Sequence, residues 1–513
     1  MLSPVGIAAV DNDCEMTSTR FSPFVVPNRA PTDRSAPGRG SGRKVHFAMA
    51  HKYPMINMNE AVDRVISRAH PLPHENVAFV DAVGRVVAEN FVAPRPHPPF
   101  AASVMDGYAV RGEDCPGVLA LIGASRAGAP MRGAGDTSVQ PGQCAYITTG
   151  APLPTGADAV VPSEDCGVDG SVVSIDAEVE AGKWVRPVGF DIKVGETLVP
   201  AGSLVGPHEV GVVAAAGGGV IRVHRKPKLA LLSTGDELAE AGEVEPEASS
   251  GRIYDANRPM LAALARTSGV DDILDLGRAP DEPGALASTV ARAHADGCDV
   301  LVTSGGVSEG DRDYLKEVLL GTHGGGIEGE VHFGRVMMKP GKPLTFAEVR
   351  LKNDARGKKM LVFALPGNPV SAAVTFHLVV VPSLRRMMGW RDPRLRRIHA
   401  VVSSDLKLDP ERPEYHRATL DWQERPAATT LGAFIPGASA DDDVMGTRYL
   451  PLAHSTGKQV SSRLTSMRGA EVLMELPRGP GTVAKGTVVS ALVIGDLSSA
   501  SVQLPAISPE VVR

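Results

Sequence analysis

The stretch Asp299–Tyr314, DVLVTSGGVSEGDRDY, decides which fold we expect for this chain. Its opening residues are apolar and β-branched, which predicts a strand buried on both faces. Gly305, Gly306 and Gly310 then let the backbone approach a ligand closely, and successive N–H groups there can line a concavity for an anion. A helical pattern begins at Tyr314. A strand that ends in such a loop and opens a helix is where open α/β sheets bind phosphate-like ligands, and a tight turn capped by aspartate is the alternative.

Strand and helix patterns alternate through residues 227–393 around this stretch. Helices are expected at Asn257–Thr267 and Pro283–Ala295, and one strand is expected at Val331–Met338. This alternation predicts a doubly wound, mostly parallel sheet. Polar loops that follow its strands should gather at one edge, the usual ligand edge. These loops are STGDE (233–237), SGGVSEGD (304–311), KPGKP (339–343) and LPGNPVS (365–371).

Whole-chain composition restricts the class of protein. A length of 513 residues predicts several domains, and a net charge of −6 argues against a nucleic-acid binder that relies on bulk positive charge. The five cysteines form no Cys-x-x-Cys pair, which argues against a cysteine zinc site or a disulfide framework. The longest apolar run, Val370–Val381, contains His377 and is too short to span a bilayer. We therefore expect a cytoplasmic protein without membrane or nucleic-acid partners.

Composition shifts suggest the domain limits. The first residues are rich in Pro, Ser, Gly and Arg without sustained periodicity, which predicts disorder, and a targeting segment is the alternative. A first helix at Met58–Ala69, which Asn59 can cap, is followed by β-rich sequence with Gly/Pro turns. The expected parts are a disordered extension at 1–51, a discontinuous N-terminal domain at 52–97 and 184–226, an inserted β domain at 98–183, the doubly wound domain at 227–393, and a C-terminal, β-barrel-like domain at 394–513.

Two charged sets in the loops suggest chemistry. Lys339 and Lys342 lie three residues apart between glycine and prolines, so a compact oxyanion could bind both, although surface lysines are the alternative. Each charge at ~4 Å would contribute about 4 kcal/mol of gross attraction at an effective dielectric constant of ~20. A set of carboxylates would repel one another unless a divalent cation or protons intervene, and Mg²⁺ suits such a set. Its members are Asp236, Glu237, Asp311 and Asp313. Anion donors beside such acids indicate cleavage or transfer at a phosphate anhydride.

Five motifs in order resemble the MoeA/gephyrin E-domain family, the molybdopterin molybdenumtransferases: TGAPLPTGADAVV, STGDEL, SGGVSEGDRDY, MKPGKPLTF and LPGNPVSA. The resemblance runs from about Asn57 to the C-terminus, and KPGKPLTFAEV is closer to eukaryotic members. It implies a homodimer of multidomain subunits whose doubly wound domain binds molybdopterin. It also implies a reaction in which adenylylated molybdopterin and molybdate give molybdenum cofactor and AMP, with Mg²⁺.

The resemblance, together with the glycine-loop and carboxylate patterns described above, assigns roles to residues. Catalytic roles fall to Ser308, Asp313, Glu237 and Asp281. Molybdate binding falls to Lys339, Lys342, Pro343 and Ser371, with Arg417 and Ser461 as candidates to complete the pocket. Cofactor binding falls to Asp106, Thr149, Gly150, Asp191, Ser304, Gly305 and Gly306. Metal binding falls to Asp236, Asp311 and Asp313.

Several points stay open within this resemblance. Arg417 could be a surface arginine, and Ser462 could replace Ser461 in the pocket. Met105 stands where many eukaryotic members have lysine, and Glu309 replaces an apolar residue of the family pattern. Two other functions compete with molybdate insertion: adenylylation of molybdopterin by ATP, and a gephyrin-like scaffold that binds partner peptides. A separate adenylyltransferase and acceptors of the finished cofactor are further expected partners.

Overall fold

The computed structural model describes residues 53–131, 138–242, 251–280, 282–307, 314–322, 326–355, 357–422 and 450–497. Chain contacts divide the molecule into the units 1–48 and 49–513, and all described residues belong to the second. None of the helices in these ranges is long and apolar enough to cross a membrane.

A six-stranded sheet forms the centre of the largest part. Its spatial order is β16-β13-β17-β20-β19-β18. The strands β16, β13, β17 and β20 run parallel, and β19 and β18 complete the sheet in antiparallel pairings. Their bounds are β13 Leu229–Thr234, β16 Ile273–Ala279, β17 Val300–Ser304, β18 Ile327–Phe333, β19 Thr345–Leu351 and β20 Met360–Leu365. A short parallel pair, β14 (Leu238–Ala239) and β15 (Ile253–Tyr254), follows β13.

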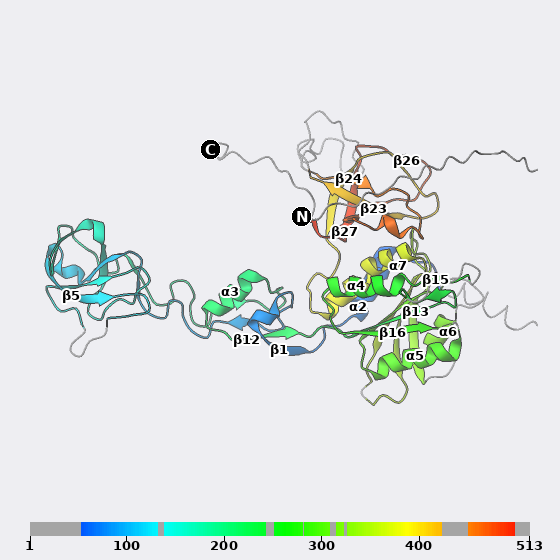
Figure 1. Ribbon diagram of the computed structural model, residues 1–513, viewed down its shortest axis with the longest axis horizontal. Helices are drawn as coiled ribbons and strands as arrows, with labels where there is room; N and C mark the ends of the chain where they lie inside the picture. The colour runs from blue at the N-terminus through cyan, green and yellow to red at the C-terminus, as the bar shows by residue number, and fades with distance from the viewer. Residues whose placement is uncertain are drawn as a thin grey trace, which may run out of the picture. The chain divides into compact units, whose positions relative to one another are not determined.

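Helices cover both faces of this sheet (Figure 1). One face packs on α2 (Met58–Arg68), α4 (Asn257–Thr267), α7 (Pro369–Thr375), the π-helical turn η5 (Phe376–Val380) and α8 (Val381–Met387). The other face packs on α5 (Pro283–Ala295) and α6 (Leu315–Leu319). Alternate residues of β13 and β17 point to opposite faces of the sheet. Leu231 and Val302 lie in the core with α2, α4 and α7, and Leu232 and Leu301 lie in the core with α5 and α6. The predicted doubly wound αβα fold is confirmed.

Short strand pairs join segments that are distant in the sequence. β1 (His74–Ala78) pairs with β12 (Val220–His224), and β2 (Phe91–Val92) pairs with β11 (Thr197–Val199). The 3-10 turn η1 (Phe79–Ala82) and helix α3 (Pro207–Ala215) pack in the same small core. Farther along, β3 (Ala102–Ser103) pairs with β10 (Val185–Arg186).

Two all-β parts complete the described chain. A six-stranded sheet of order β7-β4-β6-β5-β9-β8 consists of β4 Gly107–Val110, β5 Gly117–Ser125, β6 Gln143–Ile147, β7 Ala159–Pro162, β8 Cys166–Asp169 and β9 Val172–Ile175. A closed barrel consists of β21 Arg397–Val402, β24 Leu452–Ser455, β23 Glu414–Asp421, β25 Val472–Leu476 and β27 Val488–Val493. Beside it, β22 (Leu406–Lys407) pairs with β26 (Thr482–Val483). The expected small β-sheet and C-terminal barrel are therefore present.

Two local predictions need correction. Asn57, not Asn59, caps α2, because the extended backbone at Asn57 lets its Oδ1 accept the Glu60 N–H at 2.8 Å. The strand predicted to reach Met338 ends at Phe333. Beyond it, the Val336 N–H donates to the Lys342 carbonyl at 2.9 Å and the Met337 N–H to the Ile56 carbonyl at 2.8 Å, so the backbone leaves the sheet.

Candidate functional site

The carboxyl ends of two central strands, β17 and β20, are tied together by Asn257, the first residue of α4. Its Nδ2 donates to Ser304 Oγ at 2.6 Å and to the Gly367 carbonyl at 2.7 Å. These bonds join the loop after β17 to the loop after β20, as expected for polar loops that share one sheet edge. Asn257 was not among the predicted site residues. Its place two residues before Pro259, which lies in the first turn of α4, marks a helix start, but a bond that links two distant loops has no local sequence signal.

The loop after β17 packs closely against the end of β13. Gly305 and Gly306 have φ values of +88° and +70°, and a Cβ on Gly305 would lie 2.6 Å from the Thr234 carbonyl oxygen. The Gly305 N–H donates to the Leu365 carbonyl at 3.1 Å. Glycine is thus required here both for the backbone conformation and for the close approach.

Only part of the predicted acidic set can be placed. Asp236 and Glu237 follow β13 after Gly235, and both residues are exposed near this sheet edge. Ser308, Asp281, Asp311 and Asp313 lie outside the described residues. The proposed catalytic and metal-binding roles of this set therefore remain predictions.

The KPGKP loop docks on the first residues of β23 in the barrel. The Lys339 N–H donates to the Pro413 carbonyl at 2.9 Å, and the Tyr415 N–H donates to the Lys339 carbonyl at 2.8 Å. Lys339 Nζ lies 2.9 Å from Glu414 Oε2 and 3.4 Å from Asp409 Oδ2. Burial lowers the pKa of the Lys339 ammonium, but the bonds to Glu414 and Asp409 outweigh it and raise that pKa overall. The ammonium is therefore held in place and charged.

A chain of polar side chains continues from Lys339 into the barrel. Glu414 Oε1 lies 3.0 Å from His416 Nδ1, and His416 Nε2 lies 2.8 Å from Ser455 Oγ. Burial raises the pKa of the Glu414 carboxyl, yet the contacts with His416 and Lys339 lower it overall. The motif PEYHR supplies Glu414 and His416, but neither was predicted as a site residue, because their partners come from other parts of the chain.

The other predicted oxyanion residues lie on neighbouring segments. Ser371 is buried in the first turn of α7, and Lys342 and Pro343 are half-buried. Ser461 contacts the same helix start: its Oγ lies 3.2 Å from Asn368 Nδ2, and its carbonyl accepts the Val370 N–H at 3.0 Å. The structure thus brings the loop before α7 together with the barrel segment that carries Ser461.

Arg417 on β23 is fully buried, not a surface residue. Its Nη2 donates to Ser466 Oγ at 3.1 Å, while Nε and Nη1 have no hydrogen-bond partner among the described residues. Burial lowers the pKa of its guanidinium to about 10. The Arg417 N–H donates to the Gln459 side-chain oxygen, and the Arg417 carbonyl accepts the Thr456 N–H. Residues 456–466 therefore cover the Arg417 side chain. An anion could reach the guanidinium only if that segment shifted. A buried cation with unused donors is costly by itself and suited to bind an anion.

The small β-sheet brings together two predicted cofactor-binding residues. Asp106 Oδ1 accepts the Thr149 N–H at 2.6 Å and the Thr149 hydroxyl at 2.9 Å. These two bonds lower the pKa of the Asp106 carboxyl. Gly150 follows with a φ of +77° and donates to the Ser103 carbonyl at 2.8 Å. Asp191 lies apart from this pair, with its Oδ2 3.5 Å from Arg186 Nη1.

One large cavity has a lining that contains no residue of the glycine loop. It measures about 790 Å³ and lies between the start of α2 and the barrel, with Asn57, Met58, Met337, Pro413 and Val483 in its lining. The lining of this cavity also includes Glu414, the carboxylate that pairs with Lys339. We place the candidate site at the sheet edge and the KPGKP loop, because the charged and glycine-rich loops converge there.

Comparison with known proteins confirms the resemblance. Family models match in chain order: "MoeA N-terminal region (domain I and II)" at 56–217, "Probable molybdopterin binding domain" at 230–386 and "MoeA C-terminal region (domain IV)" at 446–494. A molybdopterin molybdenumtransferase 2 of Mycobacterium tuberculosis is 35% identical over 369 residues, which cover 71% of this chain and 86% of that protein.

Two further relatives extend this comparison. Gephyrin of Dictyostelium discoideum is 32% identical over 500 residues; these cover 90% of this chain but only 64% of gephyrin. The crystal structure of a molybdopterin biosynthesis MoeA protein from Pyrococcus horikosii has a TM-score of 0.68 and 27% identity, and the match covers 86% of this chain and all of that protein.

Proposed function

Because the chain belongs to the MoeA family of molybdopterin molybdenumtransferases, which act in molybdenum cofactor biosynthesis, we propose that it catalyses the insertion of molybdate. Its substrates are adenylylated molybdopterin and molybdate, and its products are molybdenum cofactor and AMP. The domain limits expected from the sequence and a cytoplasmic location form part of this proposal. It also includes a separate adenylyltransferase that supplies the substrate and acceptor proteins that receive the finished cofactor.

The observation that carries the proposal is the buried guanidinium of Arg417, whose Nε and Nη1 have no hydrogen-bond partner within the part of the chain that the structure describes. Arg417 lies on β23 three residues after Glu414, which anchors Lys339 of the KPGKP loop. After a shift of residues 456–466, a tetrahedral dianion would satisfy these donors, and it would be removed from water there. Lys339, Lys342, Pro343, Ser371 and Ser461 complete the proposed molybdate pocket.

The glycine loop and the Asp106–Thr149 pair support binding of the pterin nucleotide. Gly305 and Gly306 let the backbone after β17 approach a phosphate group at the carboxyl edge of the sheet. We assign Ser304 and Ser308 to the same loop and assign Asp106, Thr149, Gly150 and Asp191 to contacts with the substrate. Thr149 holds the Asp106 carboxylate ionised through two hydrogen bonds, so that carboxylate acts as an acceptor for ligand N–H or O–H groups.

The carboxylates after β13 fit a magnesium ion. Asp236 and Glu237 are exposed and adjacent, and Mg²⁺ binds through one or two carboxylates together with substrate phosphates. Asp311 and Asp313 would complete the set, and Glu237 and Asp281 belong to the proposed catalytic residues. When bound, Mg²⁺ would supply positive charge at the phosphate anhydride.

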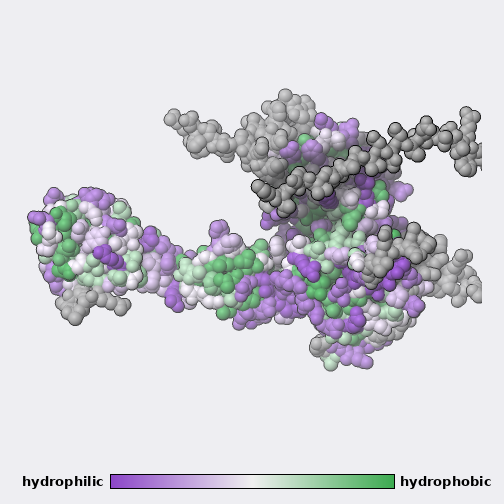
Figure 2. Space-filling view, viewed as in Figure 1, coloured by the Kyte–Doolittle hydropathy of each residue, from purple (hydrophilic) through white to green (hydrophobic). Residues whose placement is uncertain are grey.

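A homodimer is also part of the proposal. Helix α3 is apolar, yet Val212, Ala214 and Ala215 are exposed, and Figure 2 shows hydrophobic residues on the surface around α3. Exposed apolar patches mark interaction surfaces on otherwise polar proteins. Light scattering should give twice the mass of one chain, and a charged substitution at Val212 should shift the protein toward monomer. A monomer at micromolar concentration in the unchanged protein would contradict the dimer.

The decisive experiment offers the purified protein two mixtures. One contains ATP and molybdopterin, and the other contains preformed adenylylated molybdopterin and molybdate. The proposed activity releases AMP only in the second mixture. Pyrophosphate production in the first mixture, with no AMP release in the second, would identify an adenylyltransferase instead. Absence of both reactions, combined with binding of partner peptides, would favour the scaffold.

Asp313→Ser tests the assignment of the glycine loop. This variant should still bind adenylylated molybdopterin, since Gly305 and Gly306 remain, but it should release AMP at least about tenfold more slowly. Unchanged AMP release would remove Asp313 from the catalytic set.

A further inference from the structure

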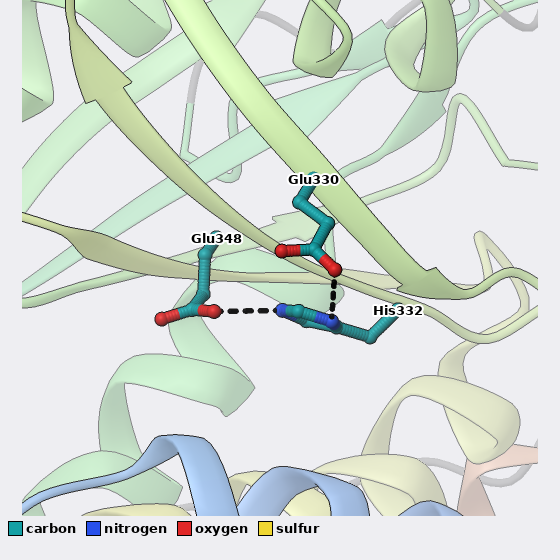
Figure 3. A group of neighbouring side chains, drawn as sticks. All are labelled: Glu330, His332 and Glu348. Atoms are coloured by element: carbon teal, nitrogen blue, oxygen red, sulfur yellow. Dashed lines mark hydrogen bonds and ion pairs between the residues drawn. The ribbon is translucent and has the colours of Figure 1, made fainter.

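Three side chains converge on the antiparallel edge of the central sheet (Figure 3). Glu330 and His332 lie two residues apart on β18, so both project from the same face of that strand. Glu348 on β19 lies directly opposite Glu330 in the strand register. The group is separate from the glycine loop, the KPGKP loop and the other residues of the proposed function.

The imidazole of His332 lies between the two carboxylates. Its Nε2 is 2.8 Å from Glu348 Oε2, and its Nδ1 is 3.5 Å from Glu330 Oε1. One ligand atom from each residue lies within 4.8 Å of the others. The side chains of His332 and Glu348 are 6% and 7% exposed, whereas that of Glu330 is 65% exposed. The group is therefore rigid on its inner side and open to solvent on its outer side.

The strand register itself requires a positive charge at this position. Carboxylates that lie directly opposite each other on paired strands repel. In the structure, Glu348 is approached by Arg68 Nη1 at 3.2 Å and by Lys359 Nζ at 3.6 Å. The side chains of both cations are partly exposed, at 41% and 55%, so either can turn outward into water when another cation takes its place beside the buried Glu348 carboxylate.

We propose that Glu330, His332 and Glu348 form a binding site for Zn²⁺. Imidazole nitrogen and carboxylate oxygen are ordinary zinc ligands, and three protein ligands leave one tetrahedral position for water. A cavity of about 260 Å³ adjoins the two carboxylates of the group, Glu330 and Glu348, and its lining also includes Glu328, Arg350 and Lys359. It gives space for that water and an entry path to the carboxylates.

Binding would exchange one positive charge for another. Zn²⁺ would occupy the space between His332 Nε2 and Glu348 in place of their hydrogen bond, and the exposed Glu330 side chain would turn from Nδ1 toward the ion. Arg68 and Lys359 compete with the ion for the Glu348 carboxylate. Lys359 therefore weakens zinc binding, and its removal should strengthen it. An increase in zinc affinity on removal of Lys359 would distinguish a zinc site from a simple ion-pair network. In such a network, the loss of Lys359 would only remove a contact.

Calorimetric titration of the metal-free, full-length protein with Zn²⁺ tests the proposal. The unchanged protein should bind one more zinc ion per chain than His332→Gln, and Glu348→Gln should weaken that site by at least about tenfold. Lys359→Met should tighten it severalfold. Glu328→Gln is the matched control, because Glu328 lies on the same strand but pairs with Arg350 at 3.0 Å, and its zinc binding should be unchanged. Equal zinc stoichiometry and affinity in the unchanged protein and in His332→Gln would overturn the proposal.

A crystal soaked with zinc gives a readout that does not depend on any variant folding. Anomalous scattering at the zinc edge should place a peak about 2.0–2.2 Å from His332 Nε2 and from a Glu348 oxygen. Zinc peaks elsewhere with none between these residues would overturn the site.

Discussion

Lys339 Nζ lies 2.9 Å from Glu414 Oε2, which ties the KPGKP loop to the first residue of barrel strand β23. The Lys339 side chain is 32% exposed and the Glu414 side chain 6%, so the carboxylate is the more enclosed partner. The pair thus has a structural role in addition to any role in anion binding: Lys339 neutralises a carboxylate that the barrel buries.

We expect Lys339→Met to destabilise the protein, because the buried negative charge of Glu414 would lose the ammonium group that neutralises it. The expected loss is about 1–3 kcal/mol in the free energy of unfolding, measured by urea titration. The double variant Lys339→Met/Glu414→Gln should recover much of this loss, because it removes the uncompensated charge as well. Additive losses in the double variant would show that the pair contributes little to stability.

A second prediction concerns His377 on the π-helical turn η5. Burial, with a smaller contribution from Arg385, lowers the pKa of this imidazole from its ordinary value of 6.5 to about 4. Between these two values the unfolded chain binds more protons at this position than the folded one. Stability from this group is therefore complete above about pH 6.5 and decreases as the pH falls toward 4, by about 1.4 kcal/mol per pH unit at most.

The unfolding free energy measured between pH 7 and pH 4 tests this sign. His377→Leu should reduce the loss of stability on acidification, and His399→Leu, at an exposed histidine of β21, should leave the loss unchanged. If both variants lose stability as steeply as the unchanged protein, His377 does not govern acid sensitivity in this range.

Elements with local signals were predicted well. The bounds predicted for Asn257–Thr267 and Pro283–Ala295 agree with the structure, because a proline in the first turn and a glycine beyond the end mark such helices locally. The cap of α2 was misplaced by two residues, since Asn57 and Asn59 offer the same side chain and only the backbone angles distinguish them.

Contacts across the sequence were harder to predict. The resemblance selected Lys339 and Arg417, but it did not indicate that Glu414 and Asp409 pair with Lys339. The burial of Arg417 was equally unforeseen, because an arginine between His416 and Ala418 reads as an ordinary strand residue. Such features depend on how the barrel docks on a loop far away in the chain, and no local pattern encodes them.

A third prediction tests the close approach of the glycine loop to β13. Gly305→Ala would place a Cβ 2.6 Å from the Thr234 carbonyl oxygen at a φ of +88°, so the loop must shift. Gly297→Ala is the matched control: its φ is +79°, but no atom lies within 4 Å of the added Cβ. Both variants should lose about 1 kcal/mol from the backbone conformation. Only Gly305→Ala should also lose affinity for adenylylated molybdopterin, measured by equilibrium binding, and equal affinities in the two variants would contradict a role for this loop.

The last prediction concerns Arg417, where stability and binding should change in opposite directions. Arg417→Met removes a buried cation whose Nε and Nη1 lack partners among the described residues, so the free energy of unfolding should stay unchanged or rise by about 1–3 kcal/mol. Molybdate affinity, measured by calorimetry, should fall at least about tenfold, since charge-assisted hydrogen bonds to the anion are lost. Arg397→Met, at an exposed arginine of β21 that pairs with Glu475 at 3.2 Å, should change neither quantity much. A large loss of stability in Arg417→Met with unchanged molybdate affinity would show that the arginine serves the barrel core and not the anion.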